Sequence, residues 1–164
     1  MFPDDIVALA NAVLDAARTQ GVMVVTAESC TAGLVAAALT VPAGSSDVVE
    51  RGFVTYSNEA KTEMLGVDAN VIERDGAVSE AVARAMAEGA LSHSRAGLAV
   101  SITGIAGPGG GTTDKPVGLV HFGVARSGEP TVHLERRFGD LGREGVRLAS
   151  VRTALNLLLD ALAA

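Results

Sequence analysis

Two short stretches of the chain, Val22–Thr26 and Leu98–Thr103, are mostly apolar, and Val22–Thr26 has little alternation between apolar and polar residues. A strand with one face in water alternates, whereas a strand covered on both faces does not. Both stretches therefore predict strands, and Val22–Thr26 predicts a central strand of a sheet with helices on both faces. Segments with helical spacing of apolar residues lie between them, so we expect an α/β fold.

The remaining patterns complete this architecture. Pro3 to Gly21 predicts a helix, and 48–56 predicts a second strand, interrupted at Arg51 and Gly52 by a bulge or by the turn into the strand. Further helices are expected after Gly33, from Asn58, from Ser79 and after Arg143, and a hairpin is expected from 117–125 and 131–138. We predict a three-layer α/β/α sandwich on a mixed, mostly parallel sheet that carries an antiparallel hairpin.

The composition fits a folded domain rather than a disordered chain. Of the 164 residues, 48% are hydrophobic and 20% are charged, which is ordinary for globular proteins. A chain of this length can bury one sizeable core without disulfide or metal support. A single domain covering residues 1–164 is expected.

Charge and sequence signals argue against several classes of protein. The formal net charge is −6 and no cluster of lysine and arginine is present, which argues against binding to nucleic acid. Cys30 is the only cysteine, so neither an intrachain disulfide nor a thiolate metal site is expected. Asp4 and Asp5 stand where a signal peptide would be basic, and no run of ~20 apolar residues is present. We expect a cytoplasmic protein without membrane contact, whose partner is a small molecule.

The first candidate site follows the strand at Val22–Thr26. The polar residues Glu28 to Thr31 come next and are expected to open a helix, whose free N–H groups favour an anion or a developing oxyanion. Ser29 would be a nucleophile there, with the amides of Cys30 and Thr31 as oxyanion donors. The alternative is that Ser29 or Thr31 only caps the helix.

A second stretch adds the partners that a nucleophilic serine needs. Ser46, Tyr56 and Lys61 fall within one short span, and serine with lysine is a known hydrolytic pairing. Lys61 lies in the first turn of a predicted helix, where a cation opposes the helix dipole and a neutral amine is favoured. A solvated surface lysine is the alternative, and Ser46 competes with Ser29 for the role of nucleophile.

Two later features would suit an anionic ligand. The strand at Leu98–Thr103 runs into Gly104 and a glycine-rich loop, which would let the backbone approach a ligand closely, although a flexible connector explains it as well. Arg143 opens the last helix, where a guanidinium and free N–H groups together bind phosphate. A surface arginine is the alternative.

Three segments in this order resemble the C-terminal domain family of the competence/damage-inducible protein CinA. They read TAESCTAG from Thr26, GSSDVVERGFVTYSNEAK from Gly44 and SITGIAGPGGGTTDKPVG from Ser101. Stand-alone members of that family are nicotinamide-mononucleotide deamidases. The resemblance implies four catalytic residues, Ser29, Ser46, Tyr56 and Lys61, and a substrate site made of Glu28, Cys30, Thr31, Gly33, Thr103, Gly104 and Arg143.

The implied reaction converts nicotinamide mononucleotide and water to nicotinate mononucleotide and ammonia, a step of pyridine-nucleotide (NAD) salvage. The protein is expected to need no metal and no cofactor, and to form a homo-oligomer. One position departs from the family pattern, because Ala32 stands where glycine is usual, and a position that needs positive φ would make this alanine unfavourable. Two alternatives remain: hydrolysis of another small amide or ester, and a non-catalytic nucleotide-binding module linked to competence or the DNA-damage response.

Overall fold

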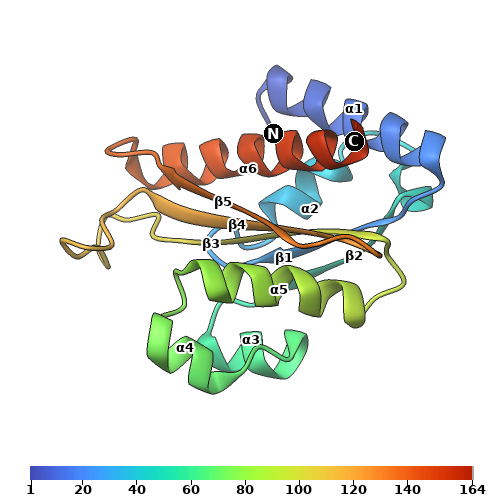
Figure 1. Ribbon diagram of the computed structural model, residues 1–164. Coiled ribbons are helices and arrows are strands. Elements are labelled where there is room, and N and C mark those ends of the chain that lie inside the picture. Colours follow the sequence, from blue (N-terminus) through green and yellow to red (C-terminus); the bar gives the residue numbers. More distant parts are fainter. Residues whose placement is uncertain (164) are drawn as a thin grey trace.

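The computed structural model describes residues 1–163 as one sheet with helices on both faces (Figure 1). The strands are β1 (Val24–Glu28), β2 (Val49–Val54), β3 (Leu98–Gly104), β4 (Leu119–Arg126) and β5 (Val132–Arg137). The helices are α1 (Asp4–Gln20), α2 (Leu34–Leu39), α3 (Asn58–Leu65), α4 (Ala69–Asp75), α5 (Glu80–Ser92) and α6 (Gly142–Ala163), with a 3-10 turn at Ser45–Asp47. No helix within residues 1–163 is long and apolar enough to cross a membrane.

The sheet is mixed, as predicted. Its order is β2-β1-β3-β4-β5, with β1 parallel to both β2 and β3, and with β4 antiparallel to β3 and β5. The predicted hairpin is confirmed as β4 and β5. Because β2, β1 and β3 run in the same direction, their carboxyl ends meet at one edge of the sheet.

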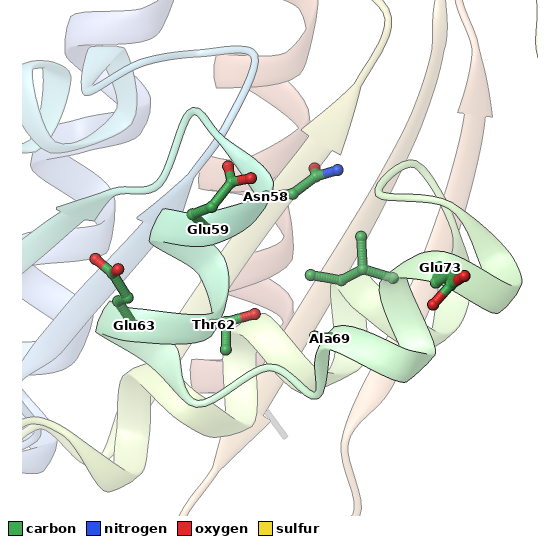
Figure 2. A pocket seen from close by; sticks show the side chains of 7 residues that line it. Asn58, Glu59, Thr62, Glu63, Ala69 and Glu73 are labelled. Atoms are coloured by element: carbon green, nitrogen blue, oxygen red, sulfur yellow. The ribbon is translucent and has the colours of Figure 1, made fainter.

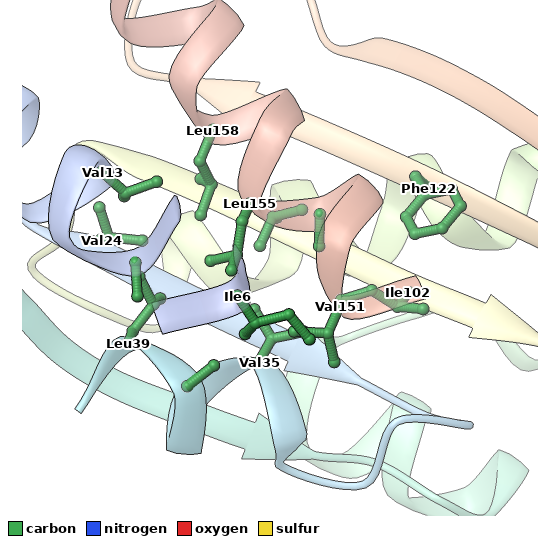
Figure 3. Packing of buried hydrophobic residues seen from close by; sticks show 14 of the residues in the cluster. Ile6, Val13, Val24, Val35, Leu39, Ile102, Phe122, Val151, Leu155 and Leu158 are labelled. Carbon is green, nitrogen blue, oxygen red and sulfur yellow. The ribbon is translucent and has the colours of Figure 1, made fainter. Parts of the chain in front are cut away.

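Two apolar cores separate the layers, as expected for strands without alternation. Helices α1, α2 and α6 cover one face, α5 covers the other, and α3 and α4 lie beyond α5 (Figure 1). The larger core joins Ile6, Leu155 and Leu158 to the sheet (Figure 3), and Val24 faces it. Val25, the next residue of β1, faces the second core under α5. Burial of both faces is therefore confirmed for β1, all of whose residues are buried.

Several local details differ from the predictions. Helix α2 begins at Leu34, so the polar residues before it form a turn instead of the first helical turn. The irregularity in β2 falls at Glu50, since Val24 pairs with Val49 and Val25 with Arg51. Helix α4 was not predicted. It is a short helix of seven residues with one fully buried side chain, which leaves little periodic signal.

Candidate active site

Ser29 and Lys61 meet at the carboxyl edge of the parallel strands. Ser29 directly follows β1, and its main-chain amide donates to the carbonyl of Ile102 at 2.9 Å, which keeps it aligned with β3. Strand β2 leads to α3, which carries Lys61 in its first turns. The two side chains are 9% and 1% exposed, and Lys61 Nζ lies 3.0 Å from Ser29 Oγ. Each is within hydrogen-bond reach of the other, as a nucleophile and its base must be.

The Lys61 amine is buried among uncharged oxygen acceptors. Its other acceptors are the carbonyls of Thr55 at 2.8 Å, Tyr56 at 3.4 Å and Ser57 at 3.5 Å. No carboxylate within residues 1–163 forms a salt bridge with it. Burial, the largest effect, lowers the pKa of Lys61 below its ordinary value. A neutral amine has a free electron pair, so this lysine is suited to take the proton of Ser29 Oγ.

A cavity of about 290 Å³ opens beside this pair. Its lining joins the three parallel strands, the glycine-rich loop and α6: Ser29, Cys30, Tyr56, Asn58, Lys61, Ala77, Val78, Thr103, Gly104, Ile105, Ala106, Gly107, Gly109, Gly110 and Arg143. The structure thus brings seven of the eleven predicted site residues to one cavity: Ser29, Cys30, Tyr56, Lys61, Thr103, Gly104 and Arg143.

Cys30 and Thr103 contribute to the wall in different ways. Burial raises the pKa of the Cys30 thiol to about 12, so its sulfur stays protonated and is a poor nucleophile. Its main-chain amide donates to no main-chain carbonyl within residues 1–163. The Thr103 hydroxyl donates to the carbonyl of Ala77 at 2.8 Å and keeps its acceptor lone pairs.

Arg143 joins three segments at the rim of the cavity. From the first turn of α6 its Nη1 donates to the carbonyl of Gly107 at 2.7 Å, and its Nη2 donates to Tyr56 Oη at 3.1 Å. Tyr56 is 60% exposed, so this contact lies at the cavity mouth. These two bonds leave further N–H groups of the guanidinium for an anion.

Glu28 does not face the cavity, contrary to expectation. It is fully buried, and each carboxylate oxygen accepts from one hydroxyl and one main-chain amide. Oε1 accepts from Thr31 Oγ1 at 2.7 Å and Val35 N at 2.9 Å, and Oε2 accepts from Thr26 Oγ1 at 3.1 Å and Ala36 N at 3.0 Å. The N-terminus of α2, which we expected to serve an oxyanion, is therefore occupied by the Glu28 side chain.

Thr31 and Gly33 also lie outside the cavity lining. The Thr31 side chain is buried against Glu28, and Gly33 begins α2 with φ +95°, a backbone conformation that favours glycine. Both residues shape the turn after Ser29. Their expected contact with substrate stays a prediction.

Ser46 lies at the other end of the sheet. It belongs to the exposed 3-10 turn that precedes β2, whereas Ser29 follows the parallel strand β1. The neighbouring Asp47 is anchored to Arg18, with Nε to Oδ2 at 2.6 Å. The structure does not bring Ser46 to Lys61, so Ser29 is the serine at the base.

Another hollow, of about 460 Å³, lies between α3 and α4 (Figure 2). Its charged side chains are Glu59, Glu63 and Glu73, and Figure 2 shows them on both helices. It is larger than the cavity at Ser29 but contains no nucleophile paired with a base. No cluster of metal-ligating side chains occurs here or elsewhere in residues 1–163. The Ser29 cavity is therefore the better candidate for a reaction.

Two features of the site were not predicted. Arg147, one turn after Arg143, donates to the carbonyls of Cys30 and Thr31, and its sequence signal is only that spacing along α6. Ala32 has φ +47°, which shows that its position does require the left-handed conformation. Its methyl group is exposed and lies outside the cavity lining.

Known proteins are similar to this chain in both sequence and fold. A family model described as the CinA C-terminal domain matches residues 6–162. A CinA-like protein of Synechococcus sp. (strain RCC307) is 50% identical over 158 residues, which cover 96% of this chain and 38% of that protein. The chain thus spans well under half of such relatives.

Two further proteins match over nearly their whole length. The nicotinamide-nucleotide amidohydrolase PncC of Escherichia coli (strain K12) is 48% identical over 159 residues, 96% of this chain and 95% of that protein. The crystal structure of the competence/damage-inducible protein CihA from Agrobacterium tumefaciens gives a TM-score of 0.97 at 54% identity, covering 100% of this chain and 99% of that one. On these grounds the chain belongs to the CinA C-terminal domain family.

Proposed function

We propose that this protein hydrolyses the carboxamide of nicotinamide mononucleotide, releasing nicotinate mononucleotide and ammonia. The observation that carries the proposal is the buried contact of 3.0 Å between Lys61 Nζ and Ser29 Oγ beside a cavity. The similarity to PncC supports the choice of substrate. The proposal places the reaction in pyridine-nucleotide salvage.

The reaction proceeds in two halves. Neutral Lys61 takes the hydroxyl proton as Ser29 Oγ bonds to the carboxamide carbon, and the amide of Cys30 stabilises the oxyanion. Lys61 then returns the proton to the nitrogen as the C–N bond breaks and ammonia departs. Water attacks the resulting ester and gives a proton to Lys61, which returns it to Ser29 Oγ as the ester bond breaks. The carboxylic acid that forms then loses its proton to solvent, which leaves the carboxylate product and the neutral amine. No cofactor enters this scheme.

The rest of the cavity fits a nucleotide with an anionic end. Arg143 supplies a positive charge and free N–H groups at the rim, and Thr103 and Gly104 line the same cavity as Ser29. We assign the phosphate to Arg143 and the ribose side to Thr103 and Gly104. Tyr56, whose hydroxyl accepts from Arg143, helps to hold that guanidinium in place.

Ammonia release from nicotinamide mononucleotide, followed with the purified protein, tests the proposal. Lys61→Ala should abolish turnover but leave nucleotide binding largely intact, because its role is proton transfer. Arg143→Ala should raise KM more than it lowers kcat, because a phosphate contact remote from the bond that breaks acts mainly on binding. Lys115→Ala is a matched control, since Lys115 Nζ contacts the carbonyl of Asp75 outside the cavity lining.

The same measurements separate the alternatives. Turnover of other small amides or esters but not of the mononucleotide would change the substrate and keep the hydrolase. Mononucleotide binding without any ammonia release would favour a non-catalytic module. The proposal includes a homo-oligomeric protein of the cytoplasm, and sedimentation of the purified chain measures its assembly.

A further inference from the structure

Arg147 holds the segment that carries the nucleophile, yet it does not line the cavity. Its Nε donates to the carbonyl of Cys30 at 3.1 Å, and its Nη2 donates to the carbonyl of Thr31 at 3.3 Å. More than a hundred residues separate α6 from this turn in the sequence. The guanidinium is thus a direct link between the last helix and the residues that follow Ser29.

The turn has few other restraints at this point. Ser29 is fixed through its amide, which donates to Ile102, and through its carbonyl, which accepts from the amide of Ala32 at 3.0 Å. Within residues 1–163 the carbonyl of Cys30 accepts only from Arg147. The link to the Cys30 amide runs through the second contact, because the Thr31 carbonyl that Arg147 holds shares a planar peptide with the Ala32 N–H, which donates to the carbonyl of Ser29. That Ser29 carbonyl shares a planar peptide with the Cys30 N–H, so restraining it restrains the direction of the Cys30 amide.

The positive charge of Arg147 also acts at the cavity wall. A guanidinium stays charged at any pH at which the protein is folded. Burial is the main effect on the pKa of the Cys30 thiol, and it raises that pKa to about 12, but the charge of Arg147 opposes the rise. A charge that favours a thiolate at Cys30 also favours an oxyanion that forms beside the amide of the same residue.

We propose that Arg147 is a positioning residue, which aims the Cys30 amide at the developing oxyanion and places a permanent positive charge behind it. The inference rests on Ser29 as nucleophile, as proposed above, but not on the identity of the substrate. It predicts that Arg147 affects the rate of reaction at Ser29 rather than the affinity of the cavity for its ligand.

A serine-directed fluorophosphonate tests this without any assumed substrate. In this reaction Ser29 Oγ bonds to phosphorus, fluoride leaves, and the hydroxyl proton passes to Lys61, so intact-mass measurement follows the adduct over time. Arg147→Met removes both charge and donors, Arg147→Gln keeps one donor without charge, and Arg147→Lys keeps the charge with a single contact point. Arg152→Met is the matched control, because Arg152 lies on the same helix but binds Asp5, with Nε to Oδ2 at 2.5 Å.

We expect labelling of Ser29 to slow by ~10- to 100-fold in Arg147→Met, somewhat less than the loss of an oxyanion donor itself. Arg147→Gln and Arg147→Lys should fall between Arg147→Met and the wild type, and Arg152→Met should match the wild type. The Kd for nicotinamide mononucleotide, measured in a Ser29→Ala background to prevent turnover, should change by less than about 2-fold with Arg147→Met. Loss of rate with unchanged affinity is what separates positioning from general support of the fold.

Three results would overturn the inference: labelling of Arg147→Met at the wild-type rate, parallel loss of rate and affinity in Arg147→Gln and Arg147→Lys, or no labelling of Ser29 in the wild type. If Arg147→Met does not fold, the Gln and Lys variants decide alone. A wild type that is labelled at Ser29, slows with Arg147→Met and releases no ammonia from the mononucleotide would contradict the proposed substrate and leave Arg147 in its role.

Discussion

Replacing Glu28 by glutamine tests whether this side chain supports the fold or contacts substrate. The carboxylate accepts four hydrogen bonds in a fully buried position, two of them from the amides of Val35 and Ala36 at the start of α2. In Glu28→Gln an NH2 group replaces one of the two oxygens. Whichever way the amide is turned, one main-chain N–H then faces another donor instead of an acceptor.

The expected loss of stability follows from these contacts. A buried main-chain N–H without an acceptor costs about 1–3 kcal/mol, and each of the two bonds that remain on the oxygen weakens by ~1 kcal/mol when the acceptor becomes neutral. The sum is ~3–5 kcal/mol, against a total stability of ~5–15 kcal/mol for a typical domain. For a chain of this size the melting temperature should fall by ~10 °C.

Urea unfolding of Glu28→Gln beside Glu63→Gln provides the measurement. Glu63 is exposed and forms no hydrogen bond or salt bridge within residues 1–163, so its replacement should change the free energy of unfolding by less than ~0.5 kcal/mol. At a temperature where Glu28→Gln remains folded, KM for the mononucleotide should equal the wild-type value. An unchanged unfolding midpoint together with a several-fold higher KM would refute this reasoning and return Glu28 to the substrate site.

Four further predictions concern the reacting pair and the turn after it. Ser29→Ala should abolish ammonia release while Ser46→Ala keeps kcat within about 2-fold of the wild type, and equal losses in both variants would contradict the placement of Ser46 at the far edge. The ratio kcat/KM should rise with pH through the pKa of Lys61, which burial holds below its ordinary 10.5, because only the neutral amine is a base. Between the lowered pKa of the folded state and 10.5, the unfolded chain binds a proton at Lys61 that the folded chain does not. In this pH range the free energy of unfolding of the wild type, relative to that of Lys61→Met, should therefore increase with pH. A decrease would show that the Lys61 amine is charged in the folded protein. Ala32→Gly should stabilise the protein by ~0.5–1 kcal/mol in thermal unfolding, since relief of the left-handed strain outweighs the extra freedom of glycine in the unfolded chain, whereas Ala12→Gly within α1 should destabilise it by a similar amount.

The parts of the fold that sequence patterns predicted are those where burial determines residue type. Strand β1 is covered on both faces, as its lack of alternation between apolar and polar residues predicted. Helix α1 was bounded by Pro3 and Gly21, and both residues occupy the predicted positions at its ends. Helix α4 was missed because a short helix on the outside of the molecule leaves no comparable record.

The site was predictable where chain topology alone brings residues together. Ser29 follows β1 and Lys61 follows β2, and the carboxyl ends of adjacent parallel strands share an edge. Ser46 lies close to Lys61 in the sequence, but the six residues of β2 separate them by a span of ~20 Å along the strand. The spacing of motif residues along the chain therefore did not show on which side of the strand each one falls.

Side-chain contacts between distant segments produce no pattern in the sequence from which they could be predicted. The role of Glu28 depends on the amides of α2 turning back toward β1, and the role of Arg147 depends on α6 packing over the same turn. Nothing in the residue types distinguishes a buried capping glutamate from one that binds substrate. Such assignments need coordinates.

The hydrogen bond from the Ser29 amide to the carbonyl of Ile102 should slow the motion of the main chain at the nucleophile. Since that amide is tied to a central strand, its proton should exchange with solvent deuterium only when the sheet itself opens, at rates close to those of the slowest amides in β1 and β3. Within residues 1–163 the main-chain amides of the glycine-rich segment 106–111 donate to no main-chain carbonyl, so they should exchange orders of magnitude sooner. Ligand entry and exit would then be governed by one wall of the cavity while the opposite wall stays fixed.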